Sequence, residues 1–148
     1  MNFADALEGV ERVFLDTAPI IYYFERNPHY FDRMEAFFRL RRERDIVLVT
    51  SPITLAECLV HPIKRGLTTL TSRYRHLIAE DVGTEYRQIS PHAAEQAAQL
   101  RAGVSIPLMD ALQFGVAVSA GCQAFLTNDR RLARIGKVPM ILLDDVDG

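Results

Sequence analysis

Residues 106–135 read IPLMDALQFGVAVSAGCQAFLTNDRRLARI, and this stretch decides the fold. Its first part predicts a helix that starts at about Pro107 and continues to Ala120, where a glycine stops it. Its second part predicts a buried strand at Gln123–Leu126 and then a short helix near Arg130–Ile135. A helix that leads into a fully apolar strand is typical of a parallel sheet covered by helices.

The same alternation extends over the rest of the chain. Four further segments predict strands, at Arg12–Leu15, Ile46–Val49, Glu85–Ile89 and Pro139–Leu143. Helical spacing predicts the helices between them, which begin near Thr17, Phe31, Ser51, Leu67 and Ser90. We therefore predict an α/β fold with helices on both faces of a parallel sheet. Ligands of such sheets bind beyond the carboxyl ends of the strands.

The bulk composition favours one ordinary globular domain. The chain has 148 residues, of which 49% are hydrophobic and 24% charged, and no linker or repeat divides it, so we expect a single domain over residues 1–148. No apolar run is long enough for a membrane span, and the acidic start does not resemble a signal peptide. Two isolated cysteines favour a reducing compartment, so we expect a cytoplasmic protein. The net charge of −2 provides no general attraction to nucleic acid.

Four acidic residues stand beside strongly apolar runs, namely Asp16, Glu57, Asp110 and Asp129. A carboxylate next to buried surface is costly unless its charge is compensated. Each acid has a plain alternative: Asp16 and Asp129 can cap helices, Glu57 can face solvent, and Asp110 can lie near a helix N-terminus. One divalent cation would explain all four positions, and Mg²⁺ or Mn²⁺ prefers such oxygen ligands.

These residues predict a metal-dependent phosphodiester hydrolase. The metal would activate a water molecule and stabilise charge on the scissile phosphate. The four histidines show no ligand spacing, which makes a histidine base less suitable than metal-bound hydroxide. Arg130 and Arg131 flank Asp129, where they could hold a substrate phosphate. Gln113 and Ala117 would share the helical face of Asp110 and leave room there for a ligand.

Three segments together resemble a known family: VFLDTAPIIYYFE (13–25), SPITLAECL (51–59) and PLMDALQFGVAVSAGCQAFLTNDRRLARI (107–135). They are similar to PIN domains and, among these, to the VapC-type toxins of bacterial and archaeal toxin–antitoxin pairs. The resemblance implies a three-layer α/β/α fold with a five-stranded parallel sheet. It also implies an Mg²⁺- or Mn²⁺-dependent endoribonuclease that forms a homodimer and has a cognate antitoxin.

Carried over by position, the resemblance assigns metal binding and catalysis to Asp16, Glu57, Asp110 and Asp129. Thr17 and Thr127 match hydroxyl residues that accompany the first and last acids, and Asn128 matches a more variable neighbour. For the homodimer we expect an interface near Leu67–Ile78, where apolar residues form a broad helical stripe. Aromatic residues between Tyr22 and Phe38 could hold a partner helix, although core packing explains them more simply.

Other functions are compatible with the same residues. A PIN nuclease could act in RNA maturation or on structured DNA without an antitoxin, and a non-catalytic scaffold could use the same fold without binding metal. A phosphate-accepting receiver domain is excluded by position. It needs an adjacent acidic pair after the first strand and a lysine after the last, whereas the first strand offers Asp16 alone and Lys137 precedes the final strand.

Overall fold

Five parallel strands form the centre of the computed structural model, which describes residues 1–147. The strands are β1 (Arg12–Leu15), β2 (Val47–Thr50), β3 (Thr84–Tyr86), β4 (Ala124–Thr127) and β5 (Met140–Leu142). Their order across the sheet is β3-β2-β1-β4-β5. The register places Phe14 of β1 beside Val49 of β2 and Phe125 of β4. The first strand of the chain is therefore the central one, with a neighbour on each side.

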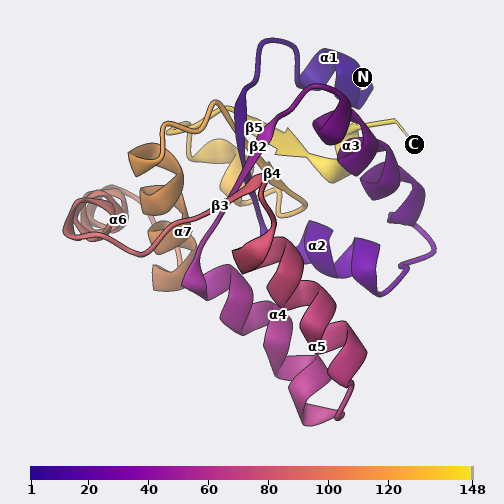
Figure 1. Cartoon of the computed structure of the whole chain (residues 1–148). Coiled ribbons are helices and arrows are strands. Elements are labelled where there is room, and N and C mark those ends of the chain that lie inside the picture. The colour runs from indigo at the N-terminus through magenta and orange to yellow at the C-terminus, as the bar shows by residue number, and fades with distance from the viewer. Residues whose placement is uncertain (148) are drawn as a thin grey trace.

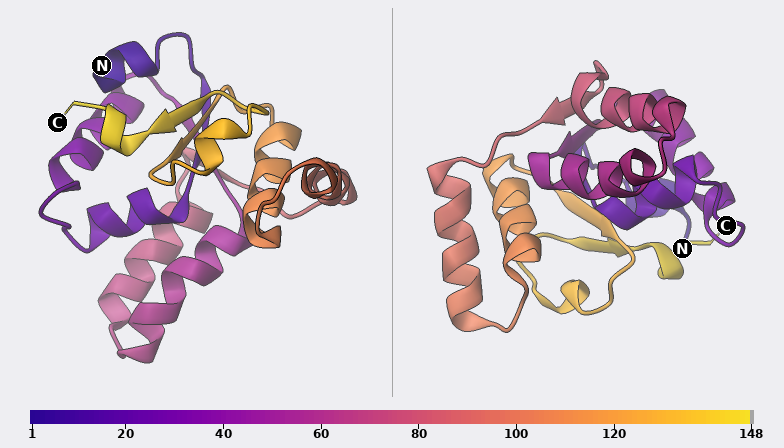
Figure 2. Two further views of the ribbon diagram at one scale, coloured as in Figure 1. Left: turned by 180° about the vertical axis from the view of Figure 1, so that it is seen from behind. Right: turned by 90° about the horizontal axis from the view of Figure 1, so that it is seen from below.

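Helices cover both faces of this sheet, as Figures 1 and 2 show. They are α1 (Phe3–Ala6), α2 (Thr17–Phe24), α3 (Phe31–Glu43), α4 (Pro52–Lys64), α5 (Thr68–Arg75), α6 (Pro91–Gly103) and α7 (Leu108–Ser119). A π-helical turn, η1 (His76–Glu80), and two 3₁₀ turns, η2 (Leu132–Arg134) and η3 (Leu143–Asp145), complete them. Helices α6 and α7 lie on one side of the sheet, α1 to α3 lie on the other, and α4 and α5 project as a hairpin (Figure 1).

Alternation along the strands divides the core between the two faces. Val13 and Leu15 belong to the cluster that packs under α1 to α5, whereas Phe14 belongs to the cluster under α6 and α7. Phe125 stacks between Phe14 and Phe114, with ring centroids 4.7 and 4.6 Å away, and this stack fixes α7 against the sheet. The predicted three-layer α/β/α fold with a five-stranded parallel sheet is confirmed.

Some element boundaries differ from the prediction. Strand β2 covers Val47–Thr50 rather than Ile46–Val49, and β3 covers Thr84–Tyr86 rather than Glu85–Ile89. Strand β3 ends early because β2 turns into α4 after Thr50, whose carbonyl accepts the last cross-strand bond from the Arg87 N–H (2.9 Å). Helix α1 was not predicted, because four residues are too few to show a helical period.

Two further expectations concern the chain as a whole. Cys58 and Cys122 are both free, in agreement with the predicted absence of a disulfide framework. Within residues 1–147, no helix has the length and apolar character that a membrane crossing needs.

Candidate metal centre

Asp16 lies just beyond the carboxyl end of the central strand. Its backbone N–H still donates to the carbonyl of Leu126 (3.0 Å), so the residue is anchored to β4. Its side chain caps α2: Oδ1 accepts a bond from the N–H of Thr17 (2.8 Å), and Oδ2 accepts one from the hydroxyl of Thr127 (2.7 Å). Thr17 is therefore the first residue of α2, and Asp16 is its N-cap. The capping and metal-ligand roles are compatible, because a carboxylate oxygen carries two lone pairs.

Two threonines, Thr17 and Thr127, each bond Asp16 and one of the other acids. The Thr17 hydroxyl donates to Oε1 of Glu57 on α4 (3.1 Å). The Thr127 hydroxyl, which donates to Asp16, also accepts a bond from the N–H of Asp129 (3.1 Å). Glu57, Asp16 and Asp129 thus form one hydrogen-bonded chain along the carboxyl edge of β1 and β4. The structure brings them together although they are far apart in sequence.

Asp110 reaches the same region from the first turn of α7. Burial raises the pKa of its carboxyl, and the charges of Asp16 and Asp129 raise it further, whereas Arg131 lowers it. Burial also raises the pKa of Asp16, with Glu57 and Asp129 adding to the effect, while the bonds from Thr127 and Thr17 oppose it. The charges of Glu57 and Asp129 thus act on Asp16, and those of Asp16 and Asp129 act on Asp110.

Asp129 differs from the others because its charge is already paired. Arg131 lowers the pKa of Asp129 mainly through a side-chain hydrogen bond. The Nε and Nη2 atoms of Arg131 donate to Oδ1 (3.1 Å) and Oδ2 (2.7 Å) of the carboxylate. Arg130 points elsewhere and pairs with Asp145 (2.8 Å). The side-chain oxygen of Asn128 accepts the N–H of Asp144 (3.0 Å), so Asn128 holds the C-terminal turn.

A buried polar cluster that the sequence did not reveal joins α7 to α4. The Gln113 amide donates to the hydroxyl of Thr54 (2.8 Å), and its oxygen accepts a bond from the hydroxyl of Ser51. Gln113 lies one turn after Asp110, and Thr54 lies one turn before Glu57, so the cluster fixes the two acid-bearing helices against each other. Gln113 and Ala117 are buried, and the predicted room for a ligand on their face is filled by packing. The one sign of this cluster in the sequence is the amide of Gln113, which stands among apolar residues of the helix.

The donor set suits a hard divalent cation, because it consists of carboxylate oxygens, and the charges of neighbouring acids help to raise the pKa of Asp16 and that of Asp110. Within residues 1–147, however, no three Asp, Glu, His or Cys side chains converge tightly enough to enclose an ion as they stand. Arg131 holds both oxygens of Asp129, and Thr127 and the Thr17 N–H hold those of Asp16. Before Asp129 could offer its carboxylate to a metal, the Arg131 guanidinium would have to leave it.

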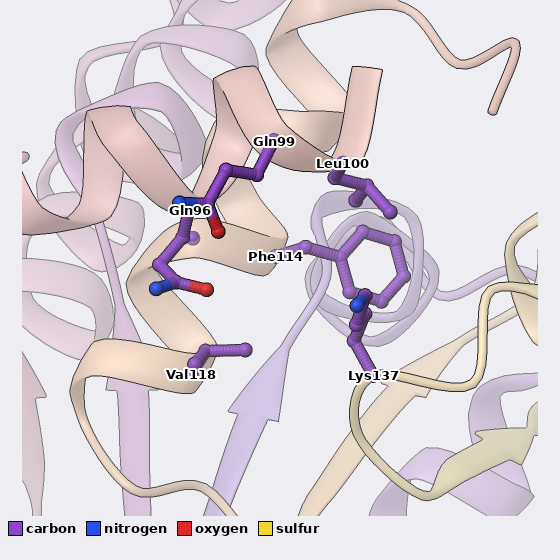
Figure 3. Close-up of a pocket in the computed structure, with 7 residues that line it drawn as sticks. Gln96, Gln99, Leu100, Phe114, Val118 and Lys137 are labelled. Atoms are coloured by element: carbon purple, nitrogen blue, oxygen red, sulfur yellow. The ribbon is translucent and has the colours of Figure 1, made fainter. Parts of the chain in front are cut away.

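A small pocket lies outside this region, between α6, α7 and the loop that carries Lys137 (Figure 3). Gln96, Gln99 and Leu100 line it from α6, and Phe114 and Val118 line it from α7. None of the four acids contributes to its lining. The carboxylates therefore remain the candidate site.

Known structures share the fold over nearly their whole length. VapBC2 from Rickettsia felis, solved with a DNA fragment from its promoter, aligns with a TM-score of 0.71 at 20% identity, covering 88% of this chain and 98% of that one. DNA-bound VapBC from Salmonella typhimurium gives 0.67 at 22% identity, with 89% and 98% covered. Mycobacterium tuberculosis VapC20, described as a sarcin-ricin loop cleaving toxin, gives 0.64 at 17% identity, with 86% and 98% covered. At these identities the likeness shows the fold.

Sequence comparison with protein families agrees with the structural likeness. The chain has no significant match among the curated proteins. The family model of the PIN domain matches residues 13–138, which span all four acids, three of the five strands completely and all but the first residue of β1. This chain belongs to the PIN domain family.

Proposed function

We propose that the chain is the toxin of a VapBC-type toxin–antitoxin pair and acts as an Mg²⁺- or Mn²⁺-dependent endoribonuclease in the cytoplasm. The observation that carries the proposal is the hydrogen-bonded chain of Glu57, Asp16 and Asp129, which Asp110 faces, at the carboxyl edge of a PIN-fold sheet. PIN nucleases generally use divalent metal ions. Solved neighbours of the fold are complexes of VapC toxins with their antitoxins, which supports a cognate antitoxin as partner.

Asp16, Glu57, Asp110 and Asp129 would hold the metal, which supplies an activated water and charge stabilisation at the phosphate. The residues of the chain prepare this chemistry. Asp16 is fixed by its cap to α2 and by Thr127, so one end of the site is rigid. Thr17 orients Glu57, and the buried amide of Gln113 keeps α4 and α7 at a set separation. Preorganised ligands of this kind lower the cost of reaching the reactive geometry.

Cleavage of RNA by the purified protein tests the proposal. We expect cleavage with Mg²⁺ or Mn²⁺, none in EDTA, and none after Asp110→Asn. Glu95→Gln is the matched control, because Glu95 is an exposed acid on α6 outside the site, and it should retain full activity. Wild-type cleavage by Asp110→Asn would refute the role of that residue. A protein that neither cleaves RNA nor binds Mn²⁺ would instead be a scaffold.

A further inference from the structure

Arg131 closes on Asp129 in a two-point ion pair. Its Nε and Nη2 atoms each contact a different carboxylate oxygen, at 3.1 and 2.7 Å. The backbone N–H of the same residue also donates to Oδ1 (3.0 Å). A guanidinium in this arrangement matches the carboxylate geometrically and neutralises its charge. Both oxygens that Asp129 could offer to a metal are thus contacted by Arg131.

The exposure of the two side chains favours departure of the guanidinium from the carboxylate. The side chain of Arg131 is 76% exposed, whereas that of Asp129 is 31% exposed, so the guanidinium can swing into solvent while the carboxylate stays in the site. The backbone N–H bond would remain after the swing, and so would the bond between the Asp129 N–H and Thr127. The orientation of Asp129 therefore does not depend on the guanidinium.

We propose that Arg131 is a latch on Asp129, which competes with the divalent metal for this carboxylate and is released when the metal binds. The proposal rests on the metal-dependent function proposed above. In the latched state the guanidinium compensates Asp129 and lessens the repulsion that Asp110 experiences from the other acids. In the released state the guanidinium is free, next to the metal, to contact a phosphate of the RNA.

Metal affinity and RNA affinity are expected to move in opposite directions when the latch is removed. An ion pair with an exposed partner is weak, so its loss changes a binding constant by at most about fivefold. Arg131→Met keeps an unbranched chain about as long as the aliphatic part of arginine and removes the charged guanidinium. This variant should bind Mn²⁺ up to about fivefold more tightly and should bind RNA more weakly. A residue with a merely structural role would not produce this opposition.

Calorimetric titration of the full chain with Mn²⁺ tests the predicted rise in metal affinity. Titration of the Mn²⁺-loaded protein with a 2′-O-methylated, non-cleavable RNA tests the predicted fall in RNA affinity. Arg130→Met is the matched control, because it removes the same charge from the same loop but from a residue that pairs with Asp145. It should leave Mn²⁺ affinity almost unchanged. Arg131→Lys, which cannot make the two-point contact, should lie between wild type and Arg131→Met.

The possible results separate this latch from the function on which it rests. If Mn²⁺ binds to the wild type and to Arg131→Met with equal affinity, or more weakly to the variant, the latch is refuted and the metal site stands. An equal rise in Mn²⁺ affinity in Arg130→Met would refute the latch too, because the loss of one positive charge near the site would then explain the effect. If no variant binds Mn²⁺, both the latch and the proposed metal-dependent function are wrong.

Discussion

Asp16 has two opposite effects on the stability of the fold. As a helix cap and the partner of Thr127 it stabilises the junction between β1 and α2. As a buried charge near Glu57 and Asp129 it destabilises the metal-free protein, and the net result is a raised pKa. A group whose pKa is higher in the folded than in the unfolded protein stabilises the fold when protonated. Stability is therefore lost as the pH rises through that folded pKa.

Asp16→Asn removes this pH-dependent cost and keeps an oxygen for the cap. We expect the variant, in EDTA, to melt at nearly the wild-type temperature at pH 4 and above it at pH 7. Thermal denaturation between these pH values measures the difference, with Glu95→Gln as the control outside the site. A variant that melts below the wild type at pH 7 would show that the bonds of the ionised carboxylate outweigh its repulsion.

Gln113 supports the site through hydrogen bonds alone. Gln113→Met retains the volume of the side chain but leaves the hydroxyls of Ser51 and Thr54 without their amide partner in a buried position. We expect a loss of about 2 kcal/mol in the free energy of unfolding, measured by urea denaturation. Gln99→Met, at an exposed position of α6, should change stability by less than about 0.5 kcal/mol. Equal effects of the two substitutions would contradict this role.

The sequence predicted the four acids because each is a charged residue in an apolar setting, a pattern that local inspection detects. It could not predict the contacts that hold the helices of these acids in place. Gln113 contacts side chains 59 and 62 positions away, and only the assembled fold brings them within reach. Arg130 and Arg131 are both close to Asp129 in sequence, but only Arg131 pairs with it, whereas Arg130 pairs with Asp145. The sequence gives no means to tell the two arginines apart.

At the level of elements, α6 and α7 pack so closely that one position tolerates only glycine. A Cβ atom on Gly115 would overlap the carbonyl oxygen of Ala93. Ala93, Ala97 and Leu100 form the inner side of α6, and the small residues among them permit the close approach. Because α7 also carries Asp110, this contact sets how far the acid reaches toward β1.

Gly115→Ala should force the two helices apart and lower the free energy of unfolding by about 2 kcal/mol. Gly103→Ala is the matched control, because a Cβ there, at the end of α6, has no atom within 4 Å. That substitution should be neutral or stabilise by up to about 1 kcal/mol. Urea denaturation of both variants gives the comparison. A Gly115→Ala protein as stable as Gly103→Ala would mean that the helices adjust without cost.

The boundaries of elements were predicted less well than their types, for reasons visible at β3 and α5. Strand β3 was expected to continue to Ile89, but a strand ends where its neighbour does, and β2 turns into α4 at Ser51. The helical stripe at Leu67–Ile78 was predicted as one surface. The chain instead passes from α5 into the π-helical turn η1, and Tyr74 and Ile78 are fully buried.

At the scale of the whole molecule, burial of Tyr74 and Ile78 moves the expected dimer interface toward the tip of the α4–α5 hairpin. Three large apolar side chains are exposed there, Val60 at 64%, Ile63 at 61% and Leu67 at 43%. Ile63 and Leu67 also line a groove that runs along α5 toward Arg75. Exposed apolar residues that cluster in this way are typical of interaction surfaces.

We expect a homodimer that Ile63→Asp dissociates, because a charge buried in an apolar interface is unfavourable. Light scattering at high micromolar concentration should return a dimer mass for the wild type and a monomer mass for the variant. Val82→Asp, on the fully exposed turn before β3, should leave the dimer intact. A wild-type protein of monomer mass would exclude the homodimer.

The central place of β1 has a consequence for synthesis on the ribosome. β1 is translated long before its neighbour β4 and before the acids Asp110 and Asp129. Until those residues emerge, one edge of β1 has no partner and half of the carboxylates do not yet exist. The RNA cleavage proposed above therefore has to wait until residues 110–129 have been synthesised, because a shorter growing chain lacks two of the four carboxylates.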